Sequence, residues 1–231
     1  MVTRMRKLGL VIYRRYGTAS AFLGIFVAVT VADVWLPARD QSAVAAWAST
    51  SVANLEHHPV GCLLLSAFIA GGAVSAWPVL IALALFGANR AVGNLRLAVV
   101  CLAGQVIGTL VSEGIVAYRV DAGLLPVSSR HLLDVGPSYV VVSAIVVALA
   151  FGSWPARLAA AADLAVLVFG GHIFAGLTSL DVAAVGHVTA LAVAAVLLIW
   201  VRRARYGRPH GTRGAGELGR SAQERRAGRP S

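Results

Sequence analysis

Six apolar segments, each long enough or nearly long enough to cross a bilayer, constrain this chain more than any other feature. A membrane-spanning helix needs about 20 mostly apolar residues, with its backbone polar groups hydrogen-bonded inside the helix. Hydrophobic residues make up 58% of the 231 residues and charged residues only 13%, too little polar surface for a soluble domain. The sequence therefore predicts an all-α membrane protein with a bundle of six transmembrane helices. The expected spans are 18–36, 61–87, 95–117, 137–153, 157–176 and 180–201.

The basic residues predict a multi-pass cell-membrane protein with both termini in the cytoplasm. Cytoplasmic loops carry an excess of Lys and Arg, and with the N-terminus inside, most basic residues next to the spans fall on one side. This inside set is Arg4, Arg6, Lys7, Arg14, Arg15, Arg90, Arg96, Arg157, Arg202, Arg203 and Arg205, while the opposite loops hold only Arg39, Arg119 and Arg130. We expect a basic cytoplasmic N-terminus over 1–17, the membrane domain over 18–201, and a disordered basic cytoplasmic tail over 202–231.

The net charge of +10 raises the alternative of nucleic-acid binding. The basic stretches directly adjoin the predicted spans, which indicates membrane orientation and contact with anionic lipid instead. We therefore expect membrane lipid and no nucleic acid among the partners. Neither a metal-ligand cluster nor a phosphate-binding glycine loop occurs, so the sequence implies no cofactor.

Polar residues inside the predicted spans are the functional candidates, because burying an ionisable group in a membrane is costly. They are Glu113, Ser138, Asp163, His172 and His187, with Asp181 at the lip of the sixth span. Ser138 and His187 have comparable depth beneath the outer face, on two spans that run in the same direction. Asp163 is expected nearer the cytoplasmic side, too far away to join them.

A serine whose proton is taken by a nearby histidine is the smallest activated nucleophile. Pro137 favours a helix start just before Ser138, which leaves the Ser138 N–H free to bind an oxyanion. A purely structural interpretation stays open, since membrane serines often bond to the preceding turn and histidines to a neighbouring helix. His172 is a rival partner for Ser138. In the third span, Gly104 and Gly108 form a small-residue stripe suited to close helix packing.

These motifs resemble those of rhomboids, the family of six-span intramembrane serine proteases. Gly136-Pro-Ser-Tyr139 resembles the Gly-x-Ser-Gly motif at the head of span four, and Asp181-Val-Ala-Ala-Val-Gly-His187 resembles the Asp…Ala-His segment of span six. His58-Pro-Val-Gly-Cys-Leu-Leu-Leu-Ser-Ala-Phe68 and Leu85-Phe-Gly87 resemble the surroundings of span two. The resemblance runs from about residue 17 to 201. It implies a rhomboid-like protease that cleaves single-span membrane proteins, with Ser138 as nucleophile and His187 as general base.

The chain departs from the family pattern in a way that marks it as a divergent, rhomboid-like relative. Tyr139 stands where the family usually has Gly, and Val188 follows His187 in place of Gly. Rhomboids usually carry an oxyanion-binding His and Asn in span two, where this chain has Ser75 and Val79. Support for the oxyanion is therefore expected from Ser75 and from the Gly136 motif, since a Val side chain cannot donate.

Two alternatives to the protease stay open. One is a rhomboid pseudoprotease that binds membrane clients without cutting them, and the other is a small transporter that uses Asp163 or Glu113. The use of a single lysine among 20 basic residues is typical of GC-rich genomes such as those of actinobacteria.

Overall fold

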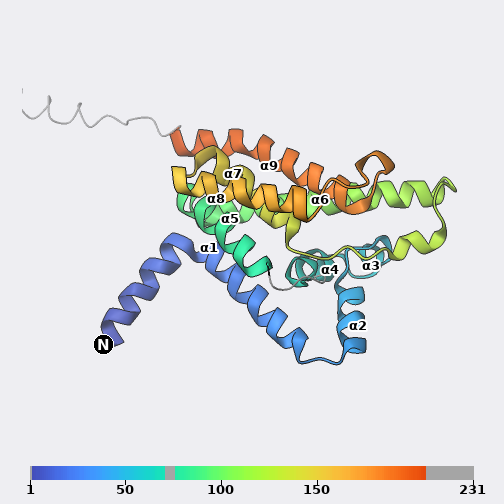
Figure 1. The fold of residues 1–231 in the computed structure, drawn as a ribbon, viewed down its shortest axis with the longest axis horizontal. Coiled ribbons are helices and arrows are strands. Elements are labelled where there is room, and N and C mark those ends of the chain that lie inside the picture. The colour runs from blue at the N-terminus through green and yellow to red at the C-terminus, as the bar shows by residue number, and fades with distance from the viewer. Residues whose placement is uncertain (1, 71–75, 207–231) are drawn as a thin grey trace, which may run out of the picture.

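The computed structural model describes residues 2–70 and 76–206, and side chains within 14–70 and 76–203 (Figure 1). Within these ranges every regular element is helical, which confirms the all-α prediction. The α-helices are α1 (Val2–Val34), α2 (Ala38–Ala48), α3 (Val52–His57), α4 (Pro59–Leu65), α5 (Trp77–Val92), α6 (Asn94–Asp121), α7 (Ser138–Phe151), α8 (Trp154–Ala165) and α9 (Val182–Tyr206). Short turns of 3-10 helix follow at Ser66–Phe68, Val127–His131 and Leu177–Ser179, and a π-helical turn at Val166–Gly170 continues α8.

Three helical stretches in the described part of the chain are both long and apolar enough to cross a membrane. They are Arg14–Val34, Asn94–Asp121 and Val182–Arg203, and shorter apolar helices occupy Pro59–Phe68, Trp77–Val92 and Ser138–Phe151. The bundle is therefore that of a helical membrane protein, built from long and short helices together.

The prediction of one continuous helix over 61–87 is wrong. Helix α4 ends at Leu65, the backbone is extended at Ile69 with φ −87° and ψ 129°, and α5 begins only at Trp77. Pro78 occupies the first turn of α5, where its missing N–H costs no hydrogen bond. The proline was the available signal for a second helix start, but the apolar run around it outweighed it in the prediction.

Helix α7 forms the centre of the bundle, in contact with α5, α6, α8 and α9. Nine of its 14 residues are buried. The predicted small-residue stripe of α6 allows this close packing. Gly104 faces Ser143 of α7, and Gly108 faces the Gly186 carbonyl of α9, which a Cβ on Gly108 would approach to 3.1 Å. Close contact of α6 with both helices is what holds the first turn of α7 beside the first turns of α9.

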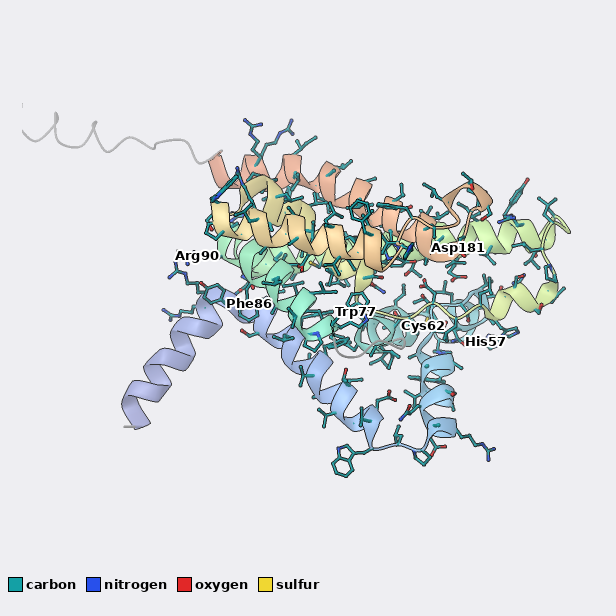
Figure 2. All side chains as sticks on the ribbon, viewed as in Figure 1. His57, Cys62, Trp77, Phe86, Arg90 and Asp181 are labelled. Atoms are coloured by element: carbon teal, nitrogen blue, oxygen red, sulfur yellow. The ribbon has the colours of Figure 1, made fainter. Side chains whose placement is uncertain are left out.

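The arginines separate between the two ends of the bundle. One end of the bundle carries Arg90 in the last turn of α5, Arg157 in the first turn of α8 and Arg202 near the end of α9. Figure 2 shows Arg90 at this end and Asp181 toward the opposite end. At the opposite end Arg130 forms ion pairs with both Glu56 and Asp121.

The first residues of the predicted tail, 202–206, are helical, because α9 continues past residue 201 to Tyr206. The rest of the predicted tail, residues 207–231, lies outside the described residues, as does Ser75.

Candidate active site

Ser138 is the first residue of α7, and the loop before it is fixed to the end of α4. Gly136 adopts φ +135°, a conformation that favours glycine, and its N–H donates to the Ser66 carbonyl over 2.9 Å. Gly136 thus supports the motif through its backbone conformation, and its N–H is already used. The N–H of Ser138 lies in the first turn of α7, where backbone donors have no partner inside the helix.

Ser138 lines a narrow polar recess between α7, α6 and the end of α4. The residues that share this recess are Thr50, Ser66, Gln105, Asp134, Val135, Gly136 and Tyr139. The recess has no room for a water molecule in this conformation. Polar side chains from four parts of the chain therefore surround the proposed nucleophile, in a closed arrangement.

Gln105 is the member of this recess that sequence reasoning missed. Its side-chain amide donates to the Ser66 hydroxyl over 3.2 Å, and its Oε1 is buried without a hydrogen-bond partner in the described structure. An uncharged, non-nucleophilic residue in an expected span was not among the candidates. A polar side chain one residue after Gly104, on the stripe that packs on α7, was the signal for it.

His187 is buried on α9, and its ring is oriented by one hydrogen bond. The Nδ1 atom lies 3.0 Å from the Ile173 carbonyl oxygen. A carbonyl can only accept, so Nδ1 carries the proton and Nε2 carries the lone pair. Nε2 is buried and has no hydrogen-bond partner among the described residues. His187 is therefore held in the tautomer whose Nε2 can accept a proton. Among the described residues, no hydrogen bond joins His187 to Ser138.

Tyr139 is the α7 side chain that meets His187. The two rings contact edge to face, with centroids 5.0 Å apart and planes at 81°. Beyond the histidine, a side chain added to Gly186 would overlap the Tyr139 ring and hydroxyl. Tyr139 thus fills the space between α6, α7 and α9 that glycines leave open.

The Tyr139 hydroxyl donates to the Asp134 carboxylate over 3.1 Å, and Thr50 donates to the same Oδ2 atom over 3.1 Å. Asp134 lies in the loop before α7, outside the membrane-spanning segments. Burial raises the pKa of Asp134, an effect that the hydrogen bonds from Tyr139 and Thr50 partly oppose. This carboxylate fixes the tyrosine and ties the loop before α7 to the loop before α3.

The remaining polar candidates are not joined to Ser138. His172 is exposed, and its Nδ1 lies 3.1 Å from the Gly170 carbonyl. Asp181 caps α9 by accepting the N–H of Ala183 over 3.1 Å. Glu113 on α6 and Asp163 on α8 are buried, with carboxylates that have no hydrogen-bond partner among the described residues and no bond to each other. The structure thus gives the transporter alternative no shared acidic site.

Val79, at one of the span-two positions where rhomboids usually carry an oxyanion donor, does not line the recess. Val79 is 58% exposed on the outer surface of α5. In the described ranges, no group of three or more His, Cys, Asp or Glu side chains is placed to hold a metal ion. Cys62 and Cys101 are both buried and free.

Apolar helices around a central α7, with a serine at the head of α7 and a buried, oriented histidine on α9, define a helical membrane protein with a candidate serine–histidine site. The chain belongs to the rhomboid-like protein family, whose model matches residues 12–205. No curated protein and no solved structure matches the chain. The family match confirms the resemblance and covers every residue of the candidate site.

Proposed function

We propose that this chain is a rhomboid-like intramembrane serine protease that cleaves single-span membrane proteins, with Ser138 as nucleophile and His187 as its base. The observation that carries the proposal is the state of the histidine. Its Nδ1 is held by the Ile173 carbonyl, so Nε2 is the basic nitrogen, buried and without a partner. A general base that takes a serine proton needs this tautomer and this vacancy.

In this proposal the described conformation is a resting state. Ser138 and His187 share no hydrogen bond, and the recess at Ser138 has no room for the water that hydrolysis requires. Catalytic hydrogen bonds are often long or poorly aligned without substrate and tighten in the substrate complex. The first turn of α7, which begins with Ser138, already touches His187 through Tyr139, and the proposal requires a rearrangement of this turn that brings Ser138 to Nε2.

Gln105 takes over the role of the missing span-two donors. An acyl-transfer site needs hydrogen-bond donors aimed at the oxyanion, and Val79 cannot contribute from the outer surface of α5. The Gln105 amide lies in the same recess as Ser138, on a side chain whose present acceptor is the neutral Ser66 hydroxyl. The Ser138 N–H and the Gln105 amide together form the proposed oxyanion site.

A substrate helix reaches this site from the lipid. An apolar cavity of about 270 Å³ lies between α1, α4 and α6, with Phe22, Leu64 and Leu102 in its walls. Gln105 lines both this cavity and the polar recess. A membrane-spanning segment entering between α1 and α6 would meet Gln105 and then Ser138.

Fluorophosphonate labelling of the purified protein tests the proposal. Wild type is expected to be labelled and to cleave single-span reporter proteins, and Ser138→Ala and His187→Ala are expected to do neither. Ser143→Ala is the matched control, because Ser143 is a second serine on α7 whose hydroxyl donates to the Tyr139 carbonyl. The protease would be rejected if labelling persisted in Ser138→Ala, or if wild type showed neither labelling nor cleavage.

One observation favours a pseudoprotease as the second candidate. The α7 side chain in contact with His187 is Tyr139, and Asp134 holds its hydroxyl. If that arrangement is permanent, the chain binds membrane clients without cutting them. The distinguishing result is a client that co-purifies equally with wild type and Ser138→Ala while neither protein is labelled.

The proposed location is the cell membrane, with both termini in the cytoplasm. The arginine-rich end of the bundle supports this orientation, because Arg90, Arg157 and Arg202 all lie there. Fusion of a cytoplasm-dependent fluorescent reporter to the C-terminus is expected to give signal, and a periplasm-dependent reporter at the same position is expected to give none.

A further inference from the structure

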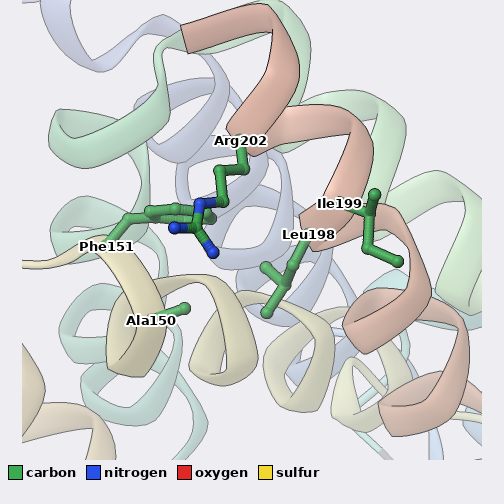
Figure 3. Close-up of a pocket in the computed structure, with 5 residues that line it drawn as sticks. All are labelled: Ala150, Phe151, Leu198, Ile199 and Arg202. Carbon is green, nitrogen blue, oxygen red and sulfur yellow. The ribbon is translucent and has the colours of Figure 1, made fainter. Parts of the chain in front are cut away.

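An open cleft of about 580 Å³ lies at the arginine-rich end of the bundle, between the end of α7 and the end of α9. Among the described residues, its walls are formed by Ala150, Phe151, Leu198 and Ile199, and Arg202 is the charged residue in its lining. Figure 3 shows the guanidinium of Arg202 pointing back from α9 toward Phe151. The cleft therefore joins an apolar trough to one positive group, far from the candidate active site.

Arg202 is exposed and has no acidic partner within the described residues. Both ion pairs among the described residues belong to Arg130, which lies at the other end of the bundle. The end of α7 directs carbonyl oxygens toward the cleft, and a helix C-terminus disfavours an anion. Arg157 offsets this effect, because its guanidinium donates to the Ala150 carbonyl over 3.1 Å. Among the described residues of the cleft, the guanidinium of Arg202 is therefore the group that favours an anion.

The position of the cleft indicates what kind of anion it takes. The apolar span Val182–Arg203 ends at Arg202 and Arg203, so the cleft lies where acyl chains of the bilayer meet their headgroups. A soluble anion gains nothing from four apolar walls, whereas a lipid uses both the walls and the guanidinium. A zwitterionic headgroup also carries a cation, and none of the described residues that line the cleft is acidic and able to receive it.

We propose that this cleft is a binding site for an anionic phospholipid. The lipid phosphate pairs with Arg202, and one acyl chain lies along Phe151, Leu198 and Ile199. Basic pockets between membrane helices on the cytoplasmic side are suited to anionic headgroups. The site does not depend on whether Ser138 is catalytic.

Native mass spectrometry of the full chain, purified in detergent with added phosphatidylglycerol or phosphatidylcholine, tests this proposal. Wild type is expected to retain phosphatidylglycerol in preference to phosphatidylcholine. Arg202→Gln is expected to weaken that retention about fivefold, the effect of one basic residue at an anionic membrane surface. Arg203→Gln is the matched control: it removes the same charge from the next, exposed residue, which does not line the cleft, and is expected to retain the lipid.

A second variant tests the cleft without changing any charge. Ala150→Trp places a ring in the trough and is expected to lose bound phosphatidylglycerol, while its monodisperse elution reports correct folding. Equal losses in Arg202→Gln and Arg203→Gln would overturn the proposal, because they would indicate general charge attraction. Full retention in Ala150→Trp, or wild type that retains added inorganic phosphate in place of lipid, would overturn it as well.

Discussion

Tyr139 of α7 occupies the space that Gly186 of α9 leaves by having no side chain. A Cβ on Gly186 would overlap the tyrosine hydroxyl, and the same tyrosine ring packs edge-on against the neighbouring His187. Rhomboids usually have Gly at the first position and Ala at the second, so the two departures compensate each other sterically. The larger side chain of the pair is on α7 in this protein, and its aromatic ring packs against the proposed base.

This complementarity predicts that Gly186→Ala destabilises the protein. Glycine to alanine in a helix normally adds up to about 1 kcal/mol of stability, but here the added carbon displaces Tyr139, which we expect to cost about 1–3 kcal/mol. Thermal unfolding in detergent measures the effect. Tyr139→Ala in the Gly186→Ala background is expected to recover part of the loss, and strictly additive effects of the two changes would contradict the proposed overlap.

A second close contact predicts that Gly104→Ala destabilises the bundle by about 1–3 kcal/mol. The new Cβ would overlap the Ser143 side chain, whose hydroxyl is already committed to the Tyr139 carbonyl. Gly114→Ala on the same helix is the control, since nothing lies within 4 Å of its added carbon. We expect Gly114→Ala to be neutral or slightly stabilising in the same unfolding assay, and a similar loss for both variants would contradict close packing at Gly104.

The buried carboxylate of Asp134 predicts a pH-dependent stability. Burial raises its pKa above the ordinary value of 3.8, so the folded state holds the proton more tightly than the unfolded state. Its contribution to stability is full below pH 3.8 and is lost as the pH rises through the raised value. We expect the melting temperature to fall less steeply with pH in Asp134→Asn than in wild type, measured from about pH 4 to about pH 8. Identical slopes would show that Asp134 does not titrate differently on folding.

If Gln105 binds the oxyanion, Gln105→Leu is expected to lower kcat about 100- to 1000-fold with little change in KM. The substitution removes the hydrogen bond from the Gln105 amide to the Ser66 hydroxyl, but it also removes a buried oxygen that has no partner in the described structure, so stability is expected to change little. A folded variant with unchanged kcat would remove Gln105 from the mechanism. A variant that loses both stability and activity would assign it a structural role.

The features that sequence predicted well are local ones. Long apolar runs gave the helices at Asn94–Asp121 and Val182–Arg203, because a span is recognisable from its own composition. Ser138 was expected at a helix start because Pro137 precedes it, and α7 begins there.

The features that sequence did not predict depend on packing between helices. The apolar run 61–87 resembles one span, and the break after α4 is fixed in part by tertiary contacts such as the hydrogen bond from Gly136 to Ser66. Adjacent residues of a helix point about 100° apart. Whether Ser138 or Tyr139 faces His187 therefore depends on how α7 is rotated, and the membership of Gln105 in the recess depends on the same rotation.

The break after α4 also has a consequence for the lipid around the protein. Helix α5 has 16 residues and thus measures about 24 Å, and α8 with its π turn is of similar length, whereas a bilayer core is about 30 Å thick. These two helices pack together and turn Val79, Leu83 and Leu158 outward. A hydrophobic flank shorter than the bilayer core is accommodated by local thinning of the hydrocarbon layer, at a cost of a fraction of a kcal/mol per Å of mismatch. We therefore expect the bilayer to be thinner on this side of the protein than on the others. A neighbouring membrane helix of ordinary length would be longer than the hydrocarbon layer at this place.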